Sequence, residues 1–249
     1  MSRILDLLFP PKCAACGVLL DWEKERCTAF CPSCLALWED EKKQTCGICA
    51  KPVSECSCMT REMENARCAS FWKLVYYLHG AKSPVQNRII YLIKRTREKL
   101  PVRFLARELS FAVSSMLDRE GIDSERMILT YIPRGARQKA QFGTDQAKVL
   151  AQALGEGLGI PLQRLLCRPK GQNRLQKRLS SEERRRNAKR AYRLAQGVAC
   201  KGCDVLLVDD IVTTGATMAA CARLLRRAGA ERIFCIAIAS DDTNRDMIL

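Results

Sequence analysis

The stretch from Cys203 to Thr217 contains the residues best suited to chemistry. Four apolar residues, Val205 to Val208, lead into two adjacent carboxylates, Asp209 and Asp210, and then into a short turn rich in hydroxyl groups. The apolar run is typical of a buried parallel strand, and the following residues have the apolar spacing of a helix. A strand, a loop and a helix N-terminus in this order are the parts from which α/β folds build phosphate sites.

The turn and the two acids predict different parts of one ligand. Unpaired N–H groups and the positive end of a helix dipole attract an anion, and a glycine lets the backbone approach it closely. Adjacent carboxylates suit a vicinal diol or a divalent cation better than a second phosphate. A chance Asp-Asp in an ordinary turn is the alternative. We expect a sugar phosphate with free hydroxyls, bound by Asp209, Asp210, Thr213, Thr214, Gly215, Ala216 and Thr217.

This run resembles the signature of type I phosphoribosyltransferases, and every position of that signature is filled. The resemblance implies that Asp209 and Asp210 hold the ribose 2′- and 3′-hydroxyls of phosphoribosyl pyrophosphate (PRPP), which binds together with Mg²⁺. It also implies that the turn from Thr213 to Thr217 holds the 5′-phosphate. The signature is more specific for binding than for catalysis.

A second predicted strand runs from Met127 to Ile132 and ends at Pro133, before a basic loop. Ligands of open α/β sheets bind beyond the carboxyl ends of the strands. The cations of this loop are therefore expected to face a pyrophosphate leaving group, and a basic surface turn without a ligand is the alternative. These cations are Arg134, Arg137 and Lys139.

The first 68 residues contain ten of the fifteen cysteines, mostly in closely spaced pairs. Such pairs suit tetrahedral zinc in closed, structural sites. A disulfide framework is the alternative, but nothing in the sequence indicates secretion. Zinc is expected at Cys13, Cys16, Cys31 and Cys34, and at Cys46, Cys49, Cys56 and Cys58, with an interleaved pairing of the four pairs left open.

The pattern divides the chain into a cysteine-rich domain, residues 1–68, and a phosphoribosyltransferase-like domain, residues 69–249. The first is too small and too polar to fold on an apolar core, so metal should supply its stability. In the second, strands alternate with helices, which predicts an α/β fold with a parallel sheet flanked by helices. Strands are expected at 71–78, 162–167, 192–194 (an edge strand) and 232–239 (closing the sheet), and helices at 85–94, 104–117 and 144–158.

The net charge of +15 is concentrated between residues 168 and 193, where eleven Lys and Arg face two acids. Such a segment suits a polyphosphate or a nucleic-acid backbone, although a solvated helix face is the alternative. The expected contacts to single-stranded DNA are Arg174, Lys177, Arg178, Arg184, Arg185 and Arg186. No apolar run approaches the ~20 residues of a membrane span, and no signal peptide is recognisable, so a cytoplasmic protein is expected.

The order of the motifs over nearly all 249 residues is similar to that of the ComF family, which includes proteins associated with natural competence. The resemblance implies a phosphoribosyltransferase-like domain joined to a zinc finger, with single-stranded DNA or a competence helicase as partner. It rests on the cysteine head, Lys94 after an apolar helical run, Ile132-Pro133, the segment 143–146, the segment 176–187 and the PRPP signature.

One segment departs from the family pattern. Many relatives read Arg-Gly-Phe-Asn-Gln where this chain has Gln141 to Gln146, so the roles of Arg137 and Lys139 stay open. Two functions compete: an enzyme that transfers the phosphoribosyl group to an acceptor that the sequence does not name, and a non-catalytic adaptor that senses PRPP and binds single-stranded DNA for a helicase.

Overall fold

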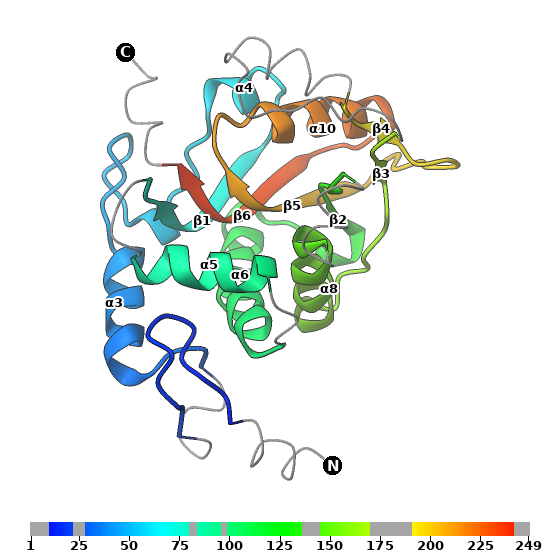
Figure 1. Cartoon of the computed structure of the whole chain (residues 1–249). Coiled ribbons are helices and arrows are strands. Elements are labelled where there is room, and N and C mark those ends of the chain that lie inside the picture. Colours follow the sequence, from blue (N-terminus) through cyan, green and yellow to red (C-terminus); the bar gives the residue numbers. More distant parts are fainter. Residues whose placement is uncertain are drawn as a thin grey trace.

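A four-stranded parallel sheet lies at the centre of the structure, a computed structural model that describes residues 10–21, 28–79, 84–95, 99–135, 145–169 and 191–241. Its strand order is β1-β6-β5-β2, and all three pairings are parallel (Figure 1). The predicted α/β class is therefore confirmed. The strands are β1 (Ser70–Tyr77), β2 (Met127–Tyr131), β5 (Asp204–Val212) and β6 (Ile233–Asp241).

Helices cover both faces of this sheet, as expected for parallel strands that read as continuous apolar runs. All nine residues of β6 are buried. Three helices pack on one face and α10 packs on the other (Figure 1). The helices are α5 (Val85–Arg95), α6 (Lys99–Glu120), α8 (Gln146–Leu158) and α10 (Ala216–Arg227). None of the helices in the described ranges is long and apolar enough to cross a membrane.

Two strand predictions were wrong. The strand after Gly229 does not close the sheet, because β6 lies between β1 and β5. The predicted edge strand at 192–194 is β4 (Arg193–Leu194), which pairs only with β3 (Leu166–Cys167) in a separate antiparallel pair. Of the strand predicted at 162–167, only β3 and one parallel bridge from Leu162 to Leu129 form. Apolar alternation marks a residue as buried but does not say which strand it pairs with.

The cysteine-rich segment shares its apolar core with the larger domain. Its elements are α3 (Pro32–Lys42), the 3₁₀ turn η1 (Val53–Glu55) and α4 (Arg61–Glu64). Phe30 and Trp38 are fully buried against Phe104 of α6, with ring centroids 5.2 and 5.8 Å from that of Phe104. Aromatic contacts at these separations add to the area that burial removes from water. The segment therefore packs directly on the face of the sheet that α5, α6 and α8 cover.

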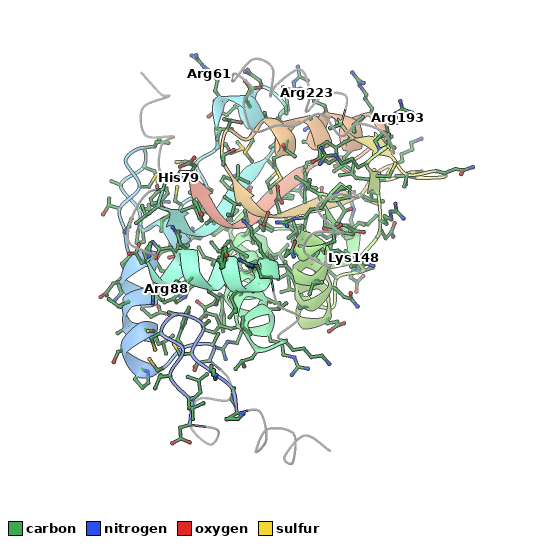
Figure 2. All side chains as sticks on the ribbon, viewed as in Figure 1. Arg61, His79, Arg88, Lys148, Arg193 and Arg223 are labelled. Atoms are coloured by element: carbon green, nitrogen blue, oxygen red, sulfur yellow. The ribbon has the colours of Figure 1, made fainter. Side chains whose placement is uncertain are left out.

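Polar contacts fix the same interface. Lys42 Nζ lies 2.6 Å from the Glu108 carboxylate, which also accepts a hydrogen bond from Trp38 Nε1 at 3.4 Å. Burial disfavours the charged amine, but the Glu108 carboxylate outweighs it and raises the pKa of Lys42. Arg88 of α5 donates to the Ala15 carbonyl oxygen at 2.7 Å (Figure 2). Because burial leaves Glu108 and Lys42 dependent on each other, this ion pair strengthens the packing of the cysteine-rich segment on α6.

Candidate functional site

The phosphate-type turn forms as the sequence predicts. Asp209 and Asp210 lie near the carboxyl end of β5, and α10 begins at Ala216 after a three-residue loop. Gly215 is the N-cap of α10, with a φ of +72° that side-chain-bearing residues rarely adopt. The Ala216 N–H donates to Thr214 Oγ1 at 3.4 Å. A helix of 12 residues thus directs its N-terminus at the end of the strand that carries both acids.

Asp210 is ionised and held by two cations. It is 7% exposed, forms an ion pair with Arg134 and lies 3.5 Å from Lys94 Nζ. Burial favours the neutral acid, but the charges of Lys94 and Arg134 outweigh it and lower the pKa of Asp210. The carboxylate is therefore charged throughout the neutral pH range.

Asp209 differs from its neighbour, although the two are adjacent. Its Oδ1 accepts a hydrogen bond from the Asp210 N–H at 2.9 Å. Burial and the negative charge of Asp210 raise the pKa of Asp209 well above its ordinary value. Two cations, Lys94 and Arg134, therefore lie at this pair of acids, beside the N-terminus of α10. Cations and a helix N-terminus at the end of a strand suit an anionic ligand.

Sequence reasoning missed Lys94 as a site residue, because the sequence marks it only as part of the family motif. It lies in the last turn of α5, far from β5 in sequence. Gln146 Nε2, at the start of α8, donates to the Lys94 carbonyl oxygen at 3.1 Å. Asp145 Oδ2 accepts from the Arg134 N–H at 3.2 Å. The Asp145-Gln146 motif thus fixes the backbones of both cations that hold Asp210, a role that no local pattern reveals.

The structure brings Arg134 to the acids, but it turns the guanidinium group onto Asp210. Arg137 and Lys139 lie outside the described residues. The same holds for all six residues predicted to contact DNA, which are Arg174, Lys177, Arg178, Arg184, Arg185 and Arg186. Arg168 and Tyr192 lie at the two ends of the basic segment, and the Arg168 guanidinium lies 5.5 Å from the ring centroid of Tyr192.

Two groups of four cysteines form, each with all its sulfur atoms within 4.8 Å of one another. The groups combine the first pair with the second and the third with the fourth, so the interleaved pairing is wrong. Sulfur atoms around tetrahedral zinc lie ~3.8 Å apart, given Zn–S bonds of ~2.3 Å. Cys16 and Cys31 Sγ are 3.7 Å apart, and no described cysteine forms a disulfide. Both groups therefore fit a tetrahedral metal ion.

Each group contains one thiol that ionises easily. Burial opposes ionisation of Cys46, but the N–H groups of Cys49 and Ile48 outweigh it and lower its pKa to about 6. In the first group, N–H groups that include that of Cys16 similarly lower the pKa of Cys13 to about 7 against the effect of burial. A thiolate is the form that binds metal, so each site presents a ready first ligand at neutral pH.

A buried lysine supports the second group. Lys73 of β1 is 4% exposed, and its Nζ lies 3.3 Å from Cys56 Sγ and 3.4 Å from the Cys58 carbonyl oxygen. Four thiolates around a divalent ion carry a net negative charge, and a neighbouring ammonium group offsets part of it. This contact links the metal site directly to an edge strand of the sheet.

The chain is similar in sequence to known proteins. A family model described as the phosphoribosyl transferase domain matches residues 147–248. "DNA utilization protein YhgH" of Salmonella typhimurium is 31% identical over 156 residues, which are 62% of this chain and 67% of that protein. "Competence protein F" of Haemophilus influenzae is 33% identical over 132 residues, which are 53% of this chain and 57% of that protein.

Among solved structures, a hypoxanthine phosphoribosyltransferase from Staphylococcus aureus is 14% identical, with a TM-score of 0.36 over 59% of this chain and 67% of that chain. A glutamine PRPP amidotransferase from B. subtilis is 18% identical, with a TM-score of 0.37 over 72% of this chain and 32% of that chain. Scores this low carry no argument about function. Together, the domain match, the two curated relatives and the cysteine groups show that the chain belongs to the ComF-like family of phosphoribosyltransferase-domain proteins.

Proposed function

We propose that the chain binds PRPP with Mg²⁺ at the end of β5 and supports the uptake or processing of DNA in natural competence. The observation that carries the binding proposal is the buried Asp210 carboxylate, held by Lys94 and Arg134 beside the N-terminus of α10. The site combines oxygen acceptors for ribose hydroxyls with two cations and a helix N-terminus for phosphates. The phosphoribosyl transferase domain match and the names of the two relatives support the same proposal.

The side chains present also fit transfer chemistry. Breaking the bond between C1 of ribose and the pyrophosphate oxygen builds positive charge on the ring and negative charge on the leaving group. The Asp210 carboxylate would balance the ring, and Arg134, with Arg137 and Lys139, would balance the leaving group. Asp209 and Asp210 supply oxygen ligands suited to Mg²⁺, which would add charge stabilisation at the pyrophosphate. No dedicated nucleophile is required, and the acceptor stays unassigned.

A second candidate is a non-catalytic adaptor that senses PRPP and binds single-stranded DNA, with the cysteine-rich segment docking a helicase. Basic side chains favour it, because Arg61 of α4, Arg223 of α10 and Arg193 of β4 project along one edge of the molecule (Figure 2). Cations along one edge suit a phosphate backbone.

We propose zinc as the metal of both cysteine groups, with a structural role. The four sulfur atoms of each group would fill all four positions of a tetrahedral zinc ion and leave none open for substrate or water, as in structural zinc sites. The free thiols of the described cysteines suit a reducing compartment, which supports a cytoplasmic location.

Asp210→Asn is expected to weaken binding of Mg-PRPP by about tenfold or more, because a neutral amide neither compensates Lys94 and Arg134 nor accepts ribose hydroxyls as strongly. Isothermal titration calorimetry measures the effect. Asp204→Asn is the matched control: it makes the same change in the same strand, at the opposite end, where Asp204 pairs with Arg232 at 2.6 Å. Equal affinities of wild type and Asp210→Asn would remove Asp210 from the ligand site.

Asp209→Asn is expected to raise the free energy of unfolding of the unliganded protein at neutral pH. The pKa of Asp209 is raised in the folded state, so the carboxyl group destabilises the fold increasingly as pH rises from 3.8 towards that raised pKa. The asparagine has no charge to lose, so the gain should be largest where the aspartate is ionised. Urea unfolding at pH 8 and pH 4.5 should show a smaller gain at the lower pH, whereas a gain independent of pH would contradict this assignment.

Cys58→Ser is expected to lower the zinc content from two ions per chain to one, because each cysteine group holds one ion. Elemental analysis of the purified protein measures the content. Cys68→Ser is the control. Cys68 is a buried cysteine of the same segment, but it belongs to neither group. Loss of zinc from both variants, or from neither, would argue against two separate sites.

Replacing Arg61, Arg193 and Arg223 with Ala is expected to reduce the salt dependence of single-stranded DNA affinity, by up to about 2 in the log–log slope if all three contact phosphates. Fluorescence anisotropy across a salt series measures the slope. Lys148→Ala, which removes an exposed cation from α8 on the other side of the sheet, is the control. An unchanged slope in the triple variant would exclude this edge as the DNA surface.

A further inference from the structure

A buried hydroxyl group in the cysteine-rich segment has no hydrogen-bond partner among the residues that the structure describes. Thr60 is 7% exposed and stands at the N-cap of α4. Its backbone carbonyl oxygen accepts from the N–H groups of Met63 and Glu64, at 2.9 and 3.1 Å. Its side chain caps nothing, because Oγ1 has no hydrogen-bond partner among the described residues. Such a hydroxyl costs about 1–3 kcal/mol, which a valine of the same shape would avoid.

The orphan hydroxyl lies against the proposed phosphate loop. A Cβ added to Gly215 would overlap Thr60 Oγ1 and would lie 3.1 Å from Met63 Cγ. The two residues belong to α4 and to the start of α10, which pack together on one side of the sheet (Figure 1). Gly215 therefore meets two demands at once: a positive φ and the close approach of Thr60.

The position of the hydroxyl restricts its partner. Because Gly215 covers Oγ1, a ligand cannot reach it while the loop keeps this conformation. The groups that can pair with it are the N–H and C=O groups of the loop itself, after a rotation of the peptide groups that a glycine allows. An anion at a helix N-terminus accepts from N–H groups that point at it, so a bound phosphate would fix the orientation of the peptide groups in this loop.

We propose that Thr60 is a positioning residue for the phosphate loop, whose hydroxyl gains its hydrogen-bond partner only when the loop holds a phosphate. The inference rests on the proposed phosphoribosyl site and extends it: a residue of the cysteine-rich segment takes part in ligand affinity. Thr60 destabilises the empty loop and stabilises the loaded one, so its effect on binding is the sum of the two.

Thr60 also lies two residues after Cys58, a member of the second cysteine group. Only one residue separates this group from the residue that contacts the proposed phosphate loop. The metal site is thus placed to hold Thr60 where the loop can use it, which gives the cysteine-rich segment a function beyond covering apolar surface.

The test compares Thr60→Val with Thr60→Ser in the full, metal-loaded chain. Removing the hydroxyl should weaken binding of Mg-PRPP and of ribose 5-phosphate about tenfold, while the melting temperature of the unliganded protein stays the same or rises. Thr60→Ser keeps the hydroxyl and should bind within about threefold of wild type. Titration calorimetry and thermal unfolding measure the two quantities.

Thr130→Val calibrates the stability readout. Thr130 is also buried, but its Oγ1 accepts from the Leu165 N–H at 3.3 Å, so removing this hydroxyl should lower the melting temperature. The inference is overturned if Thr60→Val binds as wild type does, or if Thr60→Val and Thr60→Ser lose affinity and stability together, as a packing role predicts. If wild type binds neither ligand, the proposed function itself fails, and this result is recognisable before any variant is made.

Discussion

The ion pairs of Asp210 are the interaction on which the site depends. A buried carboxylate is stable only when its charge is compensated, and Lys94 and Arg134 supply that compensation from α5 and from the end of β2. Neither cation could reach Asp210 unless the backbones that carry them were fixed. Asp145 and Gln146 fix them through one hydrogen bond each. One buried charge therefore determines how four segments meet at the end of the sheet.

The cysteine-rich segment is part of this arrangement. Its aromatic side chains extend the core beneath α6, and Glu108 fixes Lys42 and Trp38 at the interface. On the other side of the sheet, the chain leading from Cys58 to β1 passes against the loop at Gly215. A metal bound by either group would stabilise local turns first, but its effect extends into the larger domain because the two share buried contacts.

The features that local spacing encodes were predicted from the sequence. The run from Val205 to Thr217 specifies strand, loop and helix by itself, and the close cysteine pairs specify two groups of four cysteines that could each hold a metal ion. The order of the strands was not predicted, because apolar runs record burial and not partners. Lys94 and Thr60 were missed for the same reason, since each acts on a residue more than a hundred positions away in the sequence. The predicted DNA contacts at 174–186 stay a prediction.

Buried polar groups that lower the stability of the fold point to the candidate site. Most buried polar groups here are paired: Asp204 with Arg232, and Thr130 with the Leu165 N–H. Beside the turn after β5, by contrast, burial and the charge of Asp210 raise the pKa of Asp209, and the Thr60 hydroxyl has no partner in the described part of the chain. Both lower the stability of the empty protein, and a valine or an asparagine would remove the cost. Two such departures beside one loop are what the proposed site would use, because a bound anion would reorganise the loop and the charges around it.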